Sequence, residues 1–187
     1  PSSRKDLEEK LARFVAIPPV SRVQIDVVDG KVATPASWPY SAKATQGTPY
    51  NAPGELEHMR EEGETLPYLN QLAYEIDLMC ADAEAVAETW LALGATRLTF
   101  HVESVTNVAA LFTSVRRTFG SGLAPGLVSL GVAINLATDP RLLDPLLSEV
   151  DYVQFMGIAR IGRQGQPFDE RVYRQVRSFR SRHPEFP

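Results

Sequence analysis

The sequence lacks the features that mark several large classes of protein. Its 187 residues include one cysteine, Cys80, which excludes an internal disulfide framework and fits a reducing compartment such as the cytoplasm. No apolar run approaches the roughly 18 residues of a membrane-spanning helix. The net charge of −4 disfavours a nucleic-acid partner, because phosphate binding usually needs a basic surface. We therefore expect a cytoplasmic protein that binds neither membranes nor nucleic acids.

Glycine-rich phosphate loops are missing as well. No G-x-G-x-x-G or Walker-type motif follows any strand-like run, which weakens a nucleotide-binding interpretation. What the sequence does contain is 44% hydrophobic and 22% charged residues, an ordinary globular composition that is consistent with one domain.

Five apolar runs rich in Val, Ile, Leu and Phe predict parallel strands that are covered on both faces. The later runs begin 24 to 30 residues apart, which is the spacing of βα units with helices outside a parallel sheet. The predicted strands are Arg22–Val27, Ala73–Leu78, Arg97–Val102, Leu127–Ile134 and Tyr152–Met156.

Helical patterns with recognisable ends lie between these runs. Asp82 is placed to cap a helix that Gly94 ends. Asp139 precedes a proline at the first position of another helix, and Val172, Val176 and Phe179 give the last helix an apolar stripe. Between the first two strands, Val32–Pro53 predicts a long surface loop, followed by a helix from about Glu55.

This order of elements leaves two architectures, an open doubly wound sheet and a (β/α)₈ barrel. The missing glycine loops favour the barrel, in which catalytic residues sit at the carboxyl ends of the strands. Gln24 and Asp26 share one face of the first strand, because side chains two apart in a strand point the same way. Asp29, next to Gly30, fits a structural turn equally well. Polar or soft residues also end the later strands: Asp77, His101, Glu103, Asn135 and Met156.

The segments that contain these residues resemble segments of a known family. "VQIDVVDGKVATPASWPY" resembles the strand-two segment H-x-D-V-M-D-G of the ribulose-phosphate 3-epimerases. "YEIDLMCADAEAVAETWLALGATRLTFHVES", "GVAINLATDPRLLDPLLSEVDYVQFMGI" and "GQPFDERVYRQVRSFR" are similar to later blocks of the same family, in the same order. The resemblance covers nearly the whole chain, apart from an inserted loop at about residues 32–53.

The resemblance implies a (β/α)₈ barrel and an enzyme that epimerises a phosphorylated ketopentose, of the ribulose 5-phosphate/xylulose 5-phosphate type, at C3. In that family two aspartates exchange a proton on opposite faces of an enediolate, and a divalent metal stabilises the charge. Carried over to this chain, Asp26 becomes the acid/base residue. The implied metal ligands are Gln24, Asp26 and Asp77, and the implied substrate-binding residues are Met79, His101, Glu103 and Met156.

Three departures from the family pattern leave alternatives open. Gln24 and Asp77 stand where the family has histidine, and carboxylate and amide oxygens favour hard ions, so the site binds magnesium, manganese or zinc, weakly, or no metal at all. The loop after the fifth strand carries Arg160 and Arg163, which either clamp an anion or are solvated loop charges. In the inserted loop Trp38, Tyr40 and Tyr50 form a lid or subunit contact, or pack on their own barrel.

Counted against the family, the chain supplies strands two to six with their helices, and strands one, seven and eight are missing. We therefore expect a single barrel domain over residues 1–187, truncated at both ends, that belongs to a longer chain or has its sheet edges covered in a homo-oligomer. On its own it should not epimerise efficiently. The alternatives are a catalytically impaired relative that binds a sugar phosphate, and an epimerase or decarboxylase of another sugar phosphate.

Overall fold

The computed structural model describes residues 1–41, 52–105, 107–119 and 128–187. Within them, five parallel strands form one sheet in sequential order, with helices between them, so the α/β prediction of an incomplete barrel is confirmed. Among the described residues every helix is too short or too polar to span a bilayer. The strands are β1 (Arg22–Val28), β2 (Ala73–Met79), β3 (Arg97–His101), β4 (Ser129–Ile134) and β5 (Tyr152–Phe155). The helices are α1 (Arg4–Val15), α2 (Ala52–Glu61), α3 (Ala83–Ala92), α4 (Val108–Phe119), the 3₁₀ helix η1 (Pro140–Leu146) and α5 (Arg171–Arg182).

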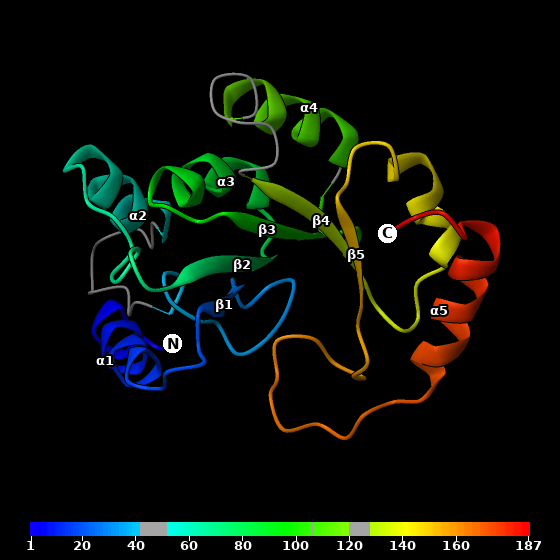
Figure 1. Ribbon diagram of the computed structural model, residues 1–187, viewed down its shortest axis with the longest axis horizontal. Coiled ribbons are helices and arrows are strands. Elements are labelled where there is room, and N and C mark those ends of the chain that lie inside the picture. The colour runs from blue at the N-terminus through cyan, green and yellow to red at the C-terminus, as the bar shows by residue number, and fades with distance from the viewer. Residues whose placement is uncertain (42–51, 106, 120–127) are drawn as a thin grey trace.

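The outer face of the sheet carries the main hydrophobic core. The strands follow one another in a curved row, and the helices lie around its outside (Figure 1). Ile25, Ile76 and Leu98 are at most 3% exposed and belong to one cluster with apolar side chains from the helices. Successive side chains of a strand alternate between faces, so this packing turns the intervening residues of each strand to the inner face.

The inner face is organised in rows that cross the strands. The pairing of neighbouring strands places Asp26, Asp77, Thr99, Gly131 and Tyr152 at one level. A Cβ atom on Gly131 would lie 2.2 Å from the ring of Tyr152, so only glycine leaves room for that ring. The Tyr152 hydroxyl lies 2.6 Å from that of Thr99 and 3.0 Å from the carbonyl oxygen of Leu98. Tyr152 therefore fills the interior at this level.

The segment after β1 is a loop, as predicted, but residues 38–40 are buried in the protein, so the prediction that the loop lies on the surface is wrong for them. Trp38 and Tyr40 are 1% and 8% exposed and belong to the main core. The Trp38 ring packs edge-on against Trp90 of α3, and its indole N–H donates to Glu55 of α2. Trp38 and Tyr40 therefore pack on their own barrel, which was the alternative to a lid or a subunit contact. Tyr50 lies outside the described residues.

Of the predicted helix ends, the cap by Asp82 is wrong, whereas the cap by Asp139 and the stop at Gly94 are confirmed. Asp82 occupies the position before α3, but its side chain makes no capping hydrogen bond. It accepts a hydrogen bond from the Tyr40 hydroxyl instead. Asp139 does cap the helix that follows it, η1, by accepting the backbone N–H of Arg141. This helix is a 3₁₀ helix with Pro145 inside it. Gly94 ends α3 with a φ of +104°, a conformation that favours glycine.

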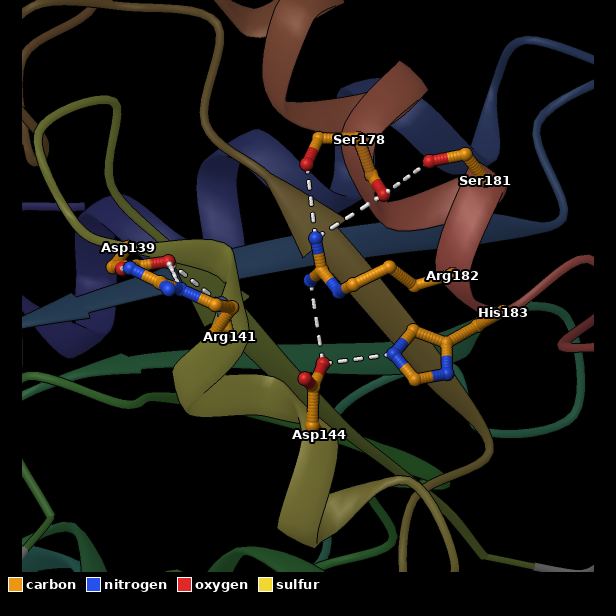
Figure 2. A network of polar contacts seen from close by, with 7 residues as sticks. All are labelled: Asp139, Arg141, Asp144, Ser178, Ser181, Arg182 and His183. Carbon is orange, nitrogen blue, oxygen red and sulfur yellow. Dashed lines mark hydrogen bonds and ion pairs between the residues drawn. The ribbon is translucent and has the colours of Figure 1, made fainter.

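The last helix is fixed to η1 by a small polar network (Figure 2). Asp144 of η1 accepts hydrogen bonds from Arg182 at 3.3 Å and from His183 at 2.7 Å. The hydrogen bond from His183, followed by that from Arg182, lowers the pKa of Asp144. Phe179, 2% exposed, packs against Phe155 of β5 beside this network. These contacts fix the C-terminal half of α5 against η1 and β5.

Candidate active site

A pocket of about 270 Å³ opens on the inner face, where the strands end. Side chains from β1, β2 and β5 line it, together with the segment that follows β5. Five of the seven predicted site residues are brought together here: Gln24, Asp26, Asp77, Met79 and Met156. The carboxyl ends of parallel strands therefore deliver these side chains to one place, as the barrel interpretation requires.

Asp26 is a partly buried carboxylate in this pocket. Burial is the largest effect on its pKa and raises it, and the nearby charge of Asp77 raises it further. A hydrogen bond of 2.8 Å from the Gln24 amide acts in the opposite direction. The net result is a pKa above the usual aspartate value, so Asp26 is better matched to proton transfer near neutral pH than an exposed aspartate.

Asp77 lies beside Asp26 on the neighbouring strand, in direct register. It is 1% exposed, and both of its carboxylate oxygens are occupied. His101 Nε2 lies 3.0 Å from Oδ1, and the Gln154 amide donates to Oδ2 at 3.0 Å. Because a carboxylate only accepts, His101 carries a proton on Nε2. Asp77 is therefore held in one orientation by two donors.

Asp29, the second aspartate of the first strand segment, has a structural role. One of its carboxylate oxygens accepts the backbone N–H groups of Lys31 and Val32, and the other accepts that of Ala81 at 2.9 Å. The carboxylate therefore ties the turn after β1 to the turn after β2. Of two aspartates three residues apart, one faces the pocket and the other holds the backbone beside it.

His101 and Glu103 do not line the pocket. His101 is fully buried, and it reaches the site only through Asp77. Glu103 accepts the backbone N–H of Asn135 at 2.9 Å and the hydroxyl of Thr138 at 2.5 Å, which fixes the turn after β4. That these two residues contact a substrate therefore remains a prediction. Their positions outside the pocket lining do not support it.

The segment after β5 supplies the rest of the pocket lining and reaches the ends of β1 and β2. Ile161 packs with Val28, Ala33 and Met79 in a second apolar cluster. The next residue, Gly162, lies so close to Ala33 that an added Cβ would be 2.8 Å from its side chain. The segment thus crosses from β5 to the turn after β1 and is anchored there.

The sequence interpretation missed Gln154. This residue lines the pocket and donates to Asp77. Its signal was present, because Gln154 lies two residues before Met156 and so shares its strand face. Of residues 162–166, the sequence singled out only Arg163, as either an anion clamp or a solvated charge, since the position of a loop depends on what it packs against.

The donors present do not fit a divalent metal. In residues 1–41, 52–105, 107–119 and 128–187, no group of three or more His, Cys, Asp or Glu side chains is arranged to hold an ion. The predicted ligands instead bind one another or their neighbours, since Gln24 donates to Asp26 and both oxygens of Asp77 are taken. Proton exchange in this pocket is therefore assigned to its side chains, with no step through a metal.

Consecutive βα units with polar side chains gathered at the carboxyl ends of the strands define an α/β fold of the barrel type. The family model described as the ribulose-phosphate 3 epimerase family matches residues 59–186, more than half of the sequence. The chain belongs to this family. The match covers β2 to α5 and does not include β1, so the assignment of Asp26 depends on the pocket geometry. A comparison with curated proteins gave no match.

Proposed function

We propose that this pocket exchanges the proton at C3 of a ketopentose phosphate, the reaction of an epimerase of the ribulose 5-phosphate/xylulose 5-phosphate type. The family membership supports an epimerase-type function in general. The observation that carries the specific proposal is Asp26, a carboxylate with a raised pKa in a pocket of suitable size at the carboxyl ends of the strands. A carbon next to a carbonyl loses its proton to such a base to give an enediolate.

The residues around Asp26 have distinct roles in this proposal. Asp26 takes the proton from C3 and returns it. Gln24 orients its carboxylate by the hydrogen bond to Oδ1. Asp77, fixed by His101 and Gln154, supplies a second negative charge that helps to hold the proton on Asp26. Met79 and Met156 give the pocket an apolar wall that excludes water.

Epimerisation needs an acid/base group on each face of the substrate, and the described pocket has such groups on one face only. Asp26 and Asp77 are paired across adjacent strands, so both approach a substrate from the same side. The segment after β5 contributes Arg163, Gln164 and Gln166 to the pocket, none of which is a carboxylate or a histidine. Proton removal and return should therefore occur largely on one face.

The 187-residue chain is accordingly expected to exchange the C3 proton faster than it inverts C3. The measurement follows D-ribulose 5-phosphate in deuterated water by NMR. It records deuterium at C3 of the remaining substrate, and separately the appearance of D-xylulose 5-phosphate. Exchange without matching inversion is the expected result. Absence of any exchange would reject the proposed function, and inversion as fast as exchange would reject the one-sided pocket.

A catalytically impaired protein that binds a sugar phosphate is the second candidate. It is favoured by the internal hydrogen bonds of Asp77, which leave that carboxylate with no free oxygen, and by the poor fit of the donors to a metal. Under this candidate the chain binds D-ribulose 5-phosphate, shows no exchange, and binds equally well after Asp26→Ala. A cytoplasmic location, a homo-oligomeric state and action on a different sugar phosphate are further proposals from the sequence.

A further inference from the structure

Arg163 brings positive charge to a pocket that otherwise holds two carboxylates. Among the described residues that line this pocket, it is the one with a cationic side chain. Other arginines near this part of the fold pair with acids, as Arg171 does with Asp169 at 2.6 Å and Arg182 with Asp144 at 3.3 Å. Within the described part of the chain, no hydrogen bond or ion pair occupies the Arg163 guanidinium. Its five N–H donors are therefore available to a ligand.

The segment that carries Arg163 is held in shape by its own contacts. Gln166 accepts the backbone N–H of Arg160 at 3.1 Å and donates to the carbonyl oxygens of Arg160 and Arg163, the second at 2.8 Å. Gly162 and Gly165 have φ values of +77° and +74°, which a side chain would strain. With Ile161 anchored in the second apolar cluster, the backbone at position 163 is fixed over the pocket.

The opposite charges of the pocket come from different elements. Asp26 and Asp77 lie on β1 and β2, whereas Arg163 is exposed and lies on the segment after β5. A phosphate group carries up to two negative charges, so the carboxylates repel it and the guanidinium attracts it. A guanidinium also matches phosphate geometry, because two parallel N–H groups can donate to two phosphate oxygens. A sugar phosphate thus has one favourable orientation, with its phosphate on the loop and its hydroxyls beside Asp26.

We propose that Arg163 is the phosphate-binding residue of this site and sets the orientation of the sugar. The identity of the sugar in this inference rests on the proposed function. The contact assigned to Arg163 is with the phosphate group alone. Arg160 belongs to the same segment and is also exposed, yet it does not line the pocket. The structure therefore separates two arginines that the sequence could not distinguish.

The test compares Arg163→Met with Arg160→Met as a matched control, using calorimetry with D-ribulose 5-phosphate, D-ribulose and inorganic phosphate. Methionine keeps much of the length and removes the charge. Arg163→Met should weaken the binding of both phosphate-containing probes by about 10-fold or more, because it removes charge-assisted hydrogen bonds. Binding of D-ribulose should change by less than about twofold in either variant, and Arg160→Met should resemble the unaltered chain.

The outcomes separate this inference from the proposed function. Equal phosphate affinities for Arg163→Met and Arg160→Met would overturn the inference, whether or not the chain exchanges the C3 proton. Phosphate binding that depends on Arg163 supports the inference even if no exchange is detected, in which case the catalytic proposal fails and the sugar-phosphate binding protein stands. Partial recovery of affinity in Arg163→Lys, which restores charge without the planar fork, would support a charge-dependent contact.

Discussion

Replacing Asp26 with asparagine is expected to lower the rate of deuterium exchange at C3 of D-ribulose 5-phosphate by about 10²–10⁴-fold, the usual contribution of a positioned acid/base group. Asparagine keeps the size of the side chain, and its carbonyl oxygen can still accept the hydrogen bond from Gln24. The change therefore removes the base and little else. NMR of the C3 signal in deuterated water gives the rate for the variant and for the unaltered chain.

Asp29→Asn is the matched control. It lies three residues further along, and its carboxylate contacts only backbone N–H groups near the pocket. Asparagine has only one oxygen to accept these N–H groups, so part of the tie between the two turns is lost while the base is kept, and the exchange rate should fall by less than about 10-fold. If Asp29→Asn removed exchange and Asp26→Asn did not, the assignment of the two aspartates would be reversed.

The stability of Asp26→Asn gives a second readout with a defined sign. Burial raises the pKa of Asp26 in the folded state, so the folded protein holds this proton more tightly than the unfolded chain. The contribution of the group to stability is fully present below the unfolded pKa and is lost as the pH rises through the folded pKa. At neutral pH the variant should therefore be at least as stable as the unaltered chain in a urea titration, and this advantage should disappear in acid. A clear loss of stability at neutral pH would mean that Asp26 has a structural role.

Trp38→Ala is expected to lower the free energy of unfolding by about 3–5 kcal/mol, the usual cost of removing a large buried aromatic ring. Trp38 is 1% exposed, packs against Trp90 and donates to Glu55, so the change leaves a cavity and an unpaired carboxylate. Urea denaturation followed by circular dichroism measures the loss. Leu142→Ala is the control, because that side chain is 56% exposed and its loss should cost about 0.5 kcal/mol or less.

Removal of the Trp38 side chain should also disturb the position of Asp26 in the active site. The neighbouring Ser37 side chain donates to the carbonyl oxygen of Asp26 at 2.7 Å and accepts the backbone N–H of Val28 at 2.9 Å. These bonds hold the end of β1 to the segment that Trp38 anchors in the core. A Trp38→Ala protein that folds with unchanged stability would show that this segment is not part of the core.

Much of the fold could be predicted from local sequence patterns. Fully buried parallel strands appear as continuous apolar runs, and the five predicted runs agree with β1 to β5 to within two residues at each end. The alternation of side chains along a strand predicted that Gln24 and Asp26 share a face, and both line the pocket. Such patterns depend on a residue and its near neighbours, which is why they can be read along the chain.

The errors came from contacts between distant segments. Trp38 and Tyr40 lie in a stretch that is polar and rich in proline, yet α2 and α3 supply the apolar surface that buries them. Asp82 has the right residue type and position for a cap, but Tyr40 takes its carboxylate. Residues 162–166 reach the pocket because the segment after β5 crosses to Ala33, and no local pattern records that crossing, so the sequence could not distinguish Arg163 from Arg160.

The pH dependence of deuterium exchange at C3 of D-ribulose 5-phosphate is the measurement that tests most directly whether Asp26 is the base of this pocket. The account predicts that kcat/KM for exchange rises with pH through one group whose pKa lies above the usual aspartate value, and that Asp26→Asn abolishes this rise. A profile that is flat, or that is unchanged in Asp26→Asn, would contradict it.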